Sequence, residues 1–543
     1  MKKLLHLLQF CFLLGATAAC AQPLQQKKVF TRQDTLRGSV TPERAWWDAT
    51  SYTISVTPDY AGRRISGSNE LQFKVLSQGT RMQIDLQQPM QLTTAVWNEM
   101  PLAVEQDGNV YYIRWPEAPP IGSVQKVLLQ FEGTPRPALT PPWDGGWIWS
   151  KDQLGRPWMS VAVQGLGASA WYPCKDYQGD EPDSAFMNIT VPDTLVAVAN
   201  GRFLGKEKSG SYTTYKWGVQ SPINNYNLVP YIGKYVNWAD TYTGEAGLLN
   251  CTYWVLDYNQ SKAKTQFSQV HQTLKALEHW FGPYPFYKDG YQLVEAPHLG
   301  MEHQSAVAYG NRFANGYLGK DLSGSGWGLK WDYIIVHETG HEWFGNNITA
   351  KDIADMWVHE GFTDYSETLF TEYFWGKKAA SEYVRGLRAS IQNDQPIIGP
   401  YGVNQEGSGD MYYKGANLVH TVRQLVQNDT LFRNILRGLN KDFYHQTVTT
   451  QQVEQYIAQK SGIDLSKVFD QYLRTTKIPV LELKKAGSNL QYRWNNVVPA
   501  FNMAVQLTNG QWLKPTTDWQ SVKGTFGSQI AAAPDFYVTT EMK

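Results

Sequence analysis

Residues 333–344 read Tyr-Ile-Ile-Val-His-Glu-Thr-Gly-His-Glu-Trp-Phe, with two histidines four positions apart. On an α-helix, positions i and i+4 share one face, so the side chains of His337 and His341 point toward one metal ion. Glu338 lies between them and reaches a water on that metal without being a ligand. The apolar residues on both sides are typical of a buried helix. The stretch therefore predicts a zinc-binding helix, and a helix with two structural histidines is the alternative.

A catalytic zinc ion needs a third protein ligand, because such sites hold three protein ligands and one open position. Glu360 follows His341 by 19 positions, within residues 355–367, which have helical spacing. We expect Glu360 to be this ligand. The adjacent His359 would point about 100° away on the same helix, so we do not expect it to bind the metal. Asp364 lies one turn after Glu360 and is expected to accept the outer N–H of a ligating histidine, or else to be a solvated carboxylate.

This zinc motif resembles that of the gluzincin aminopeptidases, the family of aminopeptidase N and leukotriene hydrolase. Residues 337–346 and 357–362 follow the family pattern, with eighteen residues between the second histidine and the glutamate. The resemblance implies one zinc ion per chain, held by the two histidines and Glu360. It also implies that Glu338 is the general base of a peptide hydrolase.

The resemblance continues upstream of the zinc motif. Residues 300–303 read Gly-Met-Glu-His and resemble the family's Gly-x-Met-Glu-Asn exopeptidase motif, with a leucine before them where the first glycine is usual. The resemblance implies that Gly300, Met301 and Glu302 contact the substrate. Glu302 would bind the free α-ammonium of a peptide. From its own sequence context Glu302 is a surface strand carboxylate, so this assignment depends on the resemblance.

Two further segments resemble the family. Residues 412–415 read Tyr-Tyr-Lys-Gly where the family has Tyr-Glu-Lys-Gly, so Tyr412 takes the place of the catalytic tyrosine. Tyr412 would donate a hydrogen bond to the negative charge that develops on the substrate oxygen. Without the resemblance, it is equally an aromatic residue packed at a helix start. Gln164 precedes residues 171–176 and resembles the glutamine that the family lends to its substrate pocket.

The spacing of apolar residues divides the chain into three parts. Short runs with period-two alternation, such as residues 127–131, fill residues 52–235 and predict β-strands. Helical spacing dominates residues 261–476, and the last residues alternate again. A helix over residues 261–281 is expected to end at Gly-Pro, and a second to begin at a Thr-x-x-Gln capping box over residues 449–452.

We therefore expect a multidomain α+β protein. Its parts are an N-terminal β-sheet domain at residues 22–239, a thermolysin-like, mainly helical zinc catalytic domain at residues 240–477 and a small C-terminal β-sandwich-like domain at residues 478–543. The family's large helical C-terminal domain has no counterpart after Ile478, so the resemblance implies a more open cleft and longer substrates.

Residues 1–21 are expected to be an export signal of the bacterial type. Lys2 and Lys3 precede a short apolar run, and small residues follow it. Two cleavages fit this pattern: ordinary cleavage before Gln22, or a lipoprotein cleavage that leaves a lipid anchor on Cys20. We expect an exported protein of the cell envelope, either periplasmic or lipid-anchored, or a secreted one.

The composition excludes several classes of protein. Lys plus Arg and Asp plus Glu both number 49, so the chain lacks the basic surplus of a nucleic-acid binder. A hydrophobic content of 42% excludes a disordered chain, and no stretch after the N-terminus is apolar for long enough to span a membrane. Cys174 and Cys251 are expected to be two separately buried thiols.

We expect peptides with a free N-terminus as substrates of a zinc aminopeptidase. A thermolysin-like endopeptidase is the first alternative, since it uses the same helix and metal but no ammonium-binding carboxylate. An inactive exported peptide-binding protein is the second, although the intact Glu338 disfavours it. Epoxide hydrolysis, known in one branch of the resembled family, stays open.

Overall fold

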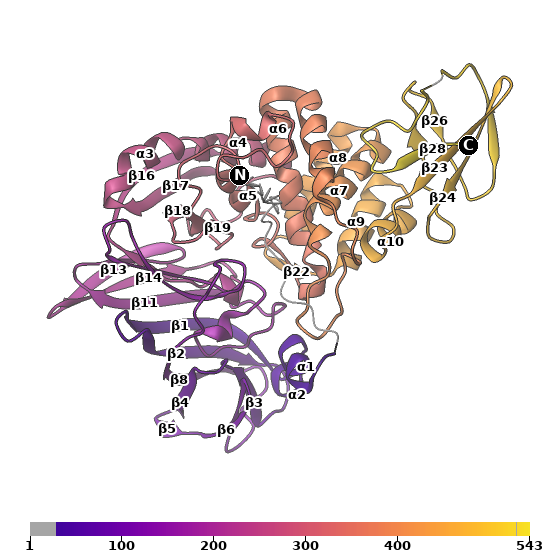
Figure 1. Cartoon of the computed structure of the whole chain (residues 1–543). Coiled ribbons are helices and arrows are strands. Elements are labelled where there is room, and N and C mark those ends of the chain that lie inside the picture. The colour runs from indigo at the N-terminus through magenta and orange to yellow at the C-terminus, as the bar shows by residue number, and fades with distance from the viewer. Residues whose placement is uncertain (1–28, 528) are drawn as a thin grey trace, which may run out of the picture.

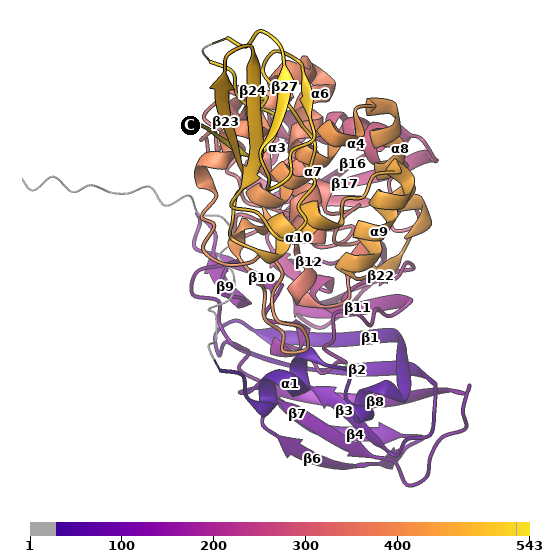
Figure 2. The ribbon, with the colours of Figure 1, turned by 90° about the vertical axis from the view of Figure 1, so that its right-hand side faces the viewer.

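The structure is a computed structural model that describes residues 29–527 and 529–543. The predicted export signal and Cys20 lie outside the described residues. In Figures 1 and 2, the β-sheets near the N-terminus are indigo to magenta, and the orange helices lie above them. Yellow strands at the C-terminus lie against the helical region, away from the first sheets. The predicted N-terminal β-sheet domain and the helical region after it are confirmed.

The N-terminal domain is built on an eight-stranded sheet. Burial alternates along its long strands because one face of the sheet is covered and the other is solvated. The central strand β1 pairs with β2 antiparallel and with β11 parallel. In spatial order, the strands are β13 (Arg202–Ser209), β14 (Tyr212–Val219), β11 (Ser184–Pro192), β1 (Trp47–Asp59), β2 (Arg64–Val75), β8 (Val124–Gly133), β4 (Gln91–Trp97) and β5 (Met100–Pro101).

Two smaller sheets share one hydrophobic core with the eight-stranded sheet. The rings of Trp46, Phe73 and Trp115 contact each other edge to face in this core. Cys174 is also buried there, and Cys251 is buried in the next part of the chain; both are free thiols, as predicted. The additional elements are α1 (Arg32–Gly38), α2 (Pro42–Ala45), β3 (Arg81–Asp85), β7 (Val110–Arg114), β6 (Ala103–Asp107), β12 (Val196–Val198), β15 (Tyr231–Gly233), β10 (Pro157–Ala162) and β9 (Gly146–Lys151).

A five-stranded mixed sheet begins the second part of the chain. Its strands, in spatial order, are β16 (Tyr235–Gly244), β17 (Gly247–Leu256), β18 (Tyr291–Glu295), β20 (Val307–Tyr309) and β19 (Gly300–Met301). The short strand β19 forms the edge of this sheet and pairs antiparallel with β20. The predicted boundary between residues 239 and 240 falls inside β16, and the division of the chain into domains stays a prediction.

The helices of the second part pack around one large core. They are α3 (Gln260–Gln266), α4 (Gln269–Phe281), α5 (Tyr333–Gly340), α6 (Trp357–Gly386), α7 (Tyr413–Val426), α8 (Asp429–Asp442), α9 (Thr450–Ser461) and α10 (Ser466–Arg474). The capping box predicted at residues 449–452 begins α9, and the side chain of Thr449 accepts from the backbone N–H of Gln452.

The single helix predicted over residues 261–281 is instead two helices, α3 and α4. The backbone stays right-handed at Phe267 and Ser268 but tightens, and the N–H of Val270 donates to the carbonyl of Phe267 in a three-residue turn. Apolar periodicity does not register such a turn, because both helices bury the same face. The predicted stop is confirmed, since Gly282 ends α4 with a φ of 95°.

The C-terminal strands pack on the helices of the second part of the chain. Leu481 and Trp494 lie in the same hydrophobic core as α6 and α7. Phe536 turns into the core, and the last strand begins at Thr539. The elements are β23 (Val480–Ala486), β24 (Asn489–Asn495), β25 (Val505–Gln506), β26 (Trp512–Leu513), β27 (Gln520–Lys523) and β28 (Thr539–Met542).

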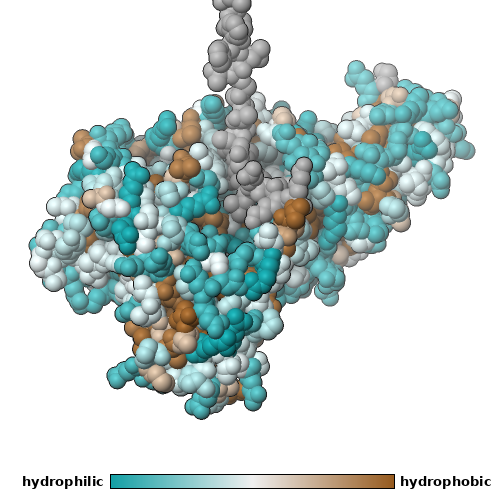
Figure 3. All heavy atoms as spheres, turned by 60° about the horizontal axis from the view of Figure 1, so that its bottom comes forward, coloured by the Kyte–Doolittle hydropathy of each residue, from teal (hydrophilic) through white to brown (hydrophobic). Residues whose placement is uncertain are grey.

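The underside of the molecule, drawn in Figure 3, is covered mostly by hydrophilic residues, and hydrophobic residues lie on it in small groups. Scattered apolar residues of this kind are normal on folded proteins and mark no partner. No helix within the described part of the chain is long and apolar enough to cross a membrane.

The stability of α5 should depend on Asp332. One oxygen of this carboxylate accepts from the backbone N–H groups of Ile334 and Ile335, and the other accepts from Gln266 and the hydroxyl of Tyr309. We expect Asp332→Ala to lower the melting temperature by about 5 °C, because it removes a helix cap and leaves buried donors unpaired. Differential scanning fluorimetry measures this shift. The control Asp518→Ala, at an exposed carboxylate near the C-terminus, should change it by about 1 °C or less; equal shifts would contradict this account.

Candidate active site

The two motif histidines project from α5 and its last turn. α5 ends at Gly340, and His341 follows it with helical angles (φ −63°, ψ −20°), so His337 and His341 keep the i,i+4 relation. Their Nε2 atoms lie 3.3 Å apart, and both side chains are buried. Two imidazole nitrogens therefore face one point, as the motif predicts.

Glu360 brings a third ligand atom to this point. It lies in the first turn of α6, and its Oε2 is 3.7 Å from Nε2 of His337 and 3.3 Å from Nε2 of His341. Oε2 is buried and has no hydrogen-bond partner among the described residues, which is costly unless a cation fills the space. Two imidazole nitrogens and one carboxylate are the ligand set of many catalytic zinc sites. These three residues could hold one zinc ion.

The outer nitrogens of the histidines fix their tautomers. Nδ1 of His337 lies 2.7 Å from Oε1 of Glu367, and Nδ1 of His341 lies 3.0 Å from the carbonyl of Phe344. A carboxylate and a carbonyl can only accept, so both Nδ1 atoms carry a proton. Both Nε2 lone pairs are consequently available to a metal.

The carboxylate that orients His337 differs from the predicted one. Asp364 was expected to accept this N–H, but the structure places Glu367 there, one turn further along the same buried face of α6. The longer side chain of Glu367 reaches the imidazole and also accepts from the hydroxyl of Tyr383 at 2.6 Å. Burial and the neighbouring Glu367 raise the pKa of Asp364 well above its ordinary value, which favours its protonated form.

Glu338 lies directly against the edge strand β19. A Cβ atom on Gly300 would be 2.5 Å from Oε1 of Glu338 and 3.0 Å from the side chain of Ile334. A larger residue at this position would displace the carboxylate of Glu338 or the side chain of Ile334. Burial raises the pKa of Glu338 to about 7. The carboxylate of Glu338 therefore faces a narrow space between α5 and β19.

Glu302 shares this pocket and is held by two side chains from the N-terminal domain. The amide of Gln164 donates to Oε1 of Glu302 and, over 3.3 Å, to Oε1 of Glu360. The hydroxyl of Tyr226 donates to the same oxygen of Glu302 at 3.1 Å. Met301 is buried and lines the pocket beside them. Nothing in the sequence around Tyr226 marked it for this position.

Tyr412 and Tyr413 both line the pocket at the start of α7. The ring of Tyr412 lies 6.3 Å from the ring of His337, nearly parallel to it. Burial and the neighbouring carboxylate of Glu360 raise the pKa of Tyr412 well above its ordinary value. Tyr412 therefore stays protonated and can donate a hydrogen bond beside the metal ligands.

All predicted site residues except Asp364 line one pocket, and two nearby histidines lie outside it. Nε2 of His359 accepts from the backbone N–H of Ala350, so this side chain turns away from the ligands as expected. Nδ1 of His303 lies 2.5 Å from the hydroxyl of Tyr231, in a buried position that lowers its pKa well below the ordinary value. His303 is a neutral core histidine.

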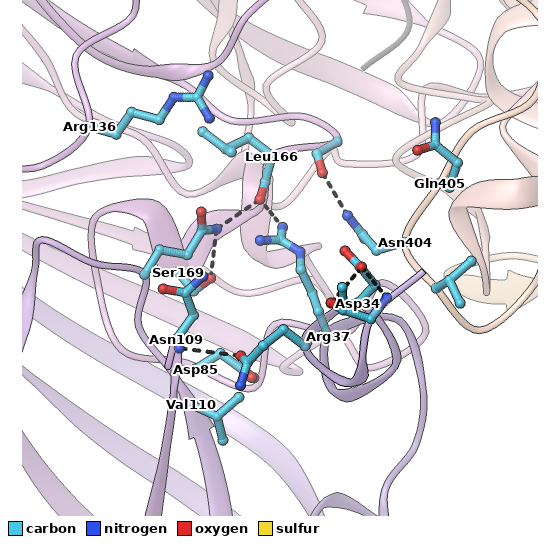
Figure 4. A pocket seen from close by; sticks show the side chains of 15 residues that line it. Asp34, Arg37, Asp85, Asn109, Val110, Arg136, Leu166, Ser169, Asn404 and Gln405 are labelled. Carbon is cyan, nitrogen blue, oxygen red and sulfur yellow. Dashed lines mark hydrogen bonds between the residues drawn. The ribbon is translucent and has the colours of Figure 1, made fainter. Parts of the chain in front are cut away.

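Hydrogen bonds to its backbone, on the side away from the active-site pocket, hold the segment that carries Gln164. Figure 4 shows a separate cavity behind this segment, in which the guanidinium of Arg37 donates to the carbonyl of Leu166. The amide of Asn404 donates to the carbonyl of Gly165 at 3.0 Å. Residues from α1 and from the loop before α7 thus hold the backbone on both sides of the turn. This contact links the placement of Gln164 to that of Tyr412.

Comparison with known proteins agrees with this geometry. The model of the peptidase family M1 domain matches residues 265–472, which include the three candidate metal ligands. The chain contains a peptidase family M1 domain. Similar curated proteins are probable aminopeptidase 1 of Sulfurisphaera tokodaii, 21% identical over 72% of this chain, and aminopeptidase M1 of Arabidopsis thaliana, 23% identical over 64%. The predicted resemblance to gluzincin aminopeptidases is confirmed.

A solved structure shares the fold of this chain. An M1 zinc metallopeptidase mutant from Deinococcus radiodurans, bound to a Tyr-Ser-Ala substrate, superposes with a TM-score of 0.69 at 20% identity. The match covers 80% of this chain and 96% of that one. By contrast, the chain spans 50% of the Sulfurisphaera relative and 40% of the Arabidopsis relative.

Zinc affinity should depend on Glu367 more than on Asp364. We expect Glu367→Ala to weaken zinc binding by about 10- to 100-fold, because His337 loses the acceptor that orients it. Asp364→Asn should have a much smaller effect, since the amide resembles the protonated carboxyl that burial favours. Competition with a fluorescent chelator measures both affinities. A loss for Asp364→Asn that equals or exceeds the loss for Glu367→Ala would contradict the geometry.

Proposed function

We propose that this chain is a zinc-dependent aminopeptidase that releases N-terminal residues from peptides. The observation that carries the proposal is the position of Glu302, whose carboxylate faces the same pocket as the metal ligands. Gln164 contacts both Glu302 and the ligand Glu360, so the two carboxylates lie on either side of one amide group. The close spacing of the Glu302 and Glu360 carboxylates suits a substrate whose ammonium group lies one residue from the bond that is cut.

The chain supplies the groups that peptide hydrolysis needs. A zinc ion held by His337, His341 and Glu360 would supply a Lewis acid for the scissile carbonyl and for water. Glu338 accepts the proton of the attacking water and returns it to the leaving amine. Tyr412 donates a hydrogen bond to the oxygen on which negative charge develops.

An endopeptidase would use the same zinc ligands and base but would have no need for Glu302. A carboxylate buried beside the cleavage site repels the carbonyl-rich backbone of an internal segment and attracts an ammonium group. Its position therefore favours release of one residue at a time over internal cleavage. We also propose export to the bacterial cell envelope, on the basis of residues 1–21 alone.

The peptide products test this function. One peptide, free or N-acetylated, is incubated with the wild-type protein or Glu302→Gln and followed by mass spectrometry, with and without a zinc chelator. We expect stepwise shortening of the free peptide only, abolished by the chelator. Glu302→Gln should lower kcat/KM by about a hundredfold with zinc content unchanged, because the buried ion pair between Glu302 and the α-ammonium of the peptide is lost.

The matched control Glu382→Gln removes a carboxylate that bonds to Trp327, outside the residues that line the pocket, and should leave kcat/KM unchanged. Internal cuts in both the free and the acetylated peptide would exclude an aminopeptidase and support the endopeptidase alternative.

Substitution can distinguish the roles of the adjacent residues Tyr412 and Tyr413. We expect Tyr412→Phe to lower kcat by about a hundredfold or more, since it removes a donor to the developing negative charge, while KM changes little. Tyr413→Phe, the matched change at the next position, should lower kcat by less than about fivefold. Steady-state kinetics on an alanine anilide measure both. The reverse order would move the catalytic role to Tyr413.

A further inference from the structure

A second cavity, of about 540 Å³, adjoins the active-site pocket. Trp143 and Leu299 line both spaces, so the cavity opens where the pocket ends. Its size lies within the ordinary range of sites for small ligands and peptide segments. Its walls come from the N-terminal domain and from the five-stranded sheet, and nothing in the proposed chemistry uses them.

The order of groups along β19 sets the direction of a bound peptide. Glu302, the proposed ammonium anchor, lies at one end, and Gly300, which contacts the base Glu338, lies two residues before it in the chain. A substrate that runs from its ammonium to its scissile bond therefore passes from Glu302 toward Gly300. The next residues of the substrate then meet Leu299 and His298, which line the second cavity.

The bound peptide would therefore run antiparallel to β19, and the backbone of β19 supports this path. The carbonyl of Leu299 accepts from the N–H of Gly310, on the side of the neighbouring strand β20. Hydrogen-bonding groups alternate from side to side along a strand, so the N–H of Gly300 faces the open edge, while its carbonyl accepts from the imidazole of His298. An extended peptide can pair with an open sheet edge of this kind.

The cavity has aromatic walls and two cationic groups. Trp158 and Phe313 line it together with Lys262 and Arg312, and neither cation forms an ion pair with a described residue within 4.0 Å. The carboxylate Glu295 also lines it but is buried and accepts from the N–H of Leu256 and the amide of Asn259. The lining therefore suits a ligand with a negatively charged group and apolar side chains.

We propose that this cavity is the downstream subsite and binds the free C-terminal carboxylate of short peptides through Lys262 and Arg312. The substrate class is then the short oligopeptide whose carboxylate reaches the cavity once its N-terminus is bound at Glu302, in contrast to the longer substrates that the resemblance implies. This inference rests on the proposed aminopeptidase function. It adds a preference for peptides with a free C-terminal carboxylate, which the catalytic groups themselves do not produce.

The test compares the tripeptide Ala-Leu-Phe as a free acid with the same tripeptide as a C-terminal amide. We expect the wild-type protein to cleave the acid with a kcat/KM about fivefold higher, through KM, and this ratio should approach one at about 0.5 M salt. The double variant Lys262→Ala/Arg312→Ala should lower the ratio to about one. Because the ratio is measured on a single preparation, partial misfolding does not mimic this result.

The control variant is Lys264→Ala, which removes the same charge from the same helix. The ammonium of Lys264 faces the ring of Trp238 at 5.8 Å and does not line the cavity, so the ratio should stay at its wild-type value. A wild-type ratio near one, or an unchanged ratio in the double variant, would overturn the subsite while cleavage of an alanine anilide keeps the proposed function. Failure to cleave the anilide as well would overturn both.

Discussion

The convergence of His337, His341 and Glu360 is the constraint on which the rest of the active site depends. It requires α5 and α6 to pack closely, and Gly340 permits this: a Cβ atom there would lie 2.6 Å from the hydroxyl of Ser366 on α6. The stacked rings of Phe344 and Phe362, 4.5 Å apart, join the ends of the two helices. The three ligand atoms meet because apolar packing holds the two helices in place. Burying Oε2 of Glu360 without a hydrogen-bond partner costs free energy, and a bound zinc ion would offset that cost.

The groups around this centre come from separate parts of the chain. Gln164 and Tyr226 come from the N-terminal β-sheet domain, Glu302 from the edge of the second sheet, and Tyr412 from the start of α7. The N-terminal domain therefore completes the proposed ammonium site as well as covering it. On this account, the distance between the anchor and the metal ligands, set by domain packing, determines that one residue is released per cycle.

The sequence predicted that His337 and His341 face one point, because i,i+4 spacing on a helix is a local property. It also predicted the β-then-helix order, since alternation and helical periodicity are local too. It could not choose between Asp364 and Glu367, which share the buried face of α6, because side-chain reach and burial decide which carboxylate meets His337. Tyr226 and Arg37 were missed for a similar reason: their contacts are formed only when distant segments pack together. The break between α3 and α4 leaves the apolar pattern intact, so periodicity concealed it.

The most direct test is a crystal structure of the zinc-loaded Glu338→Ala protein with an uncleaved tripeptide that has a free N-terminus. The account predicts the α-ammonium nitrogen within about 3 Å of the carboxylate of Glu302 and the first carbonyl beside the three metal ligands. The following residues should lie along β19 toward Leu299. A peptide whose N-terminus lies elsewhere, with an internal carbonyl at the metal ligands, would contradict it.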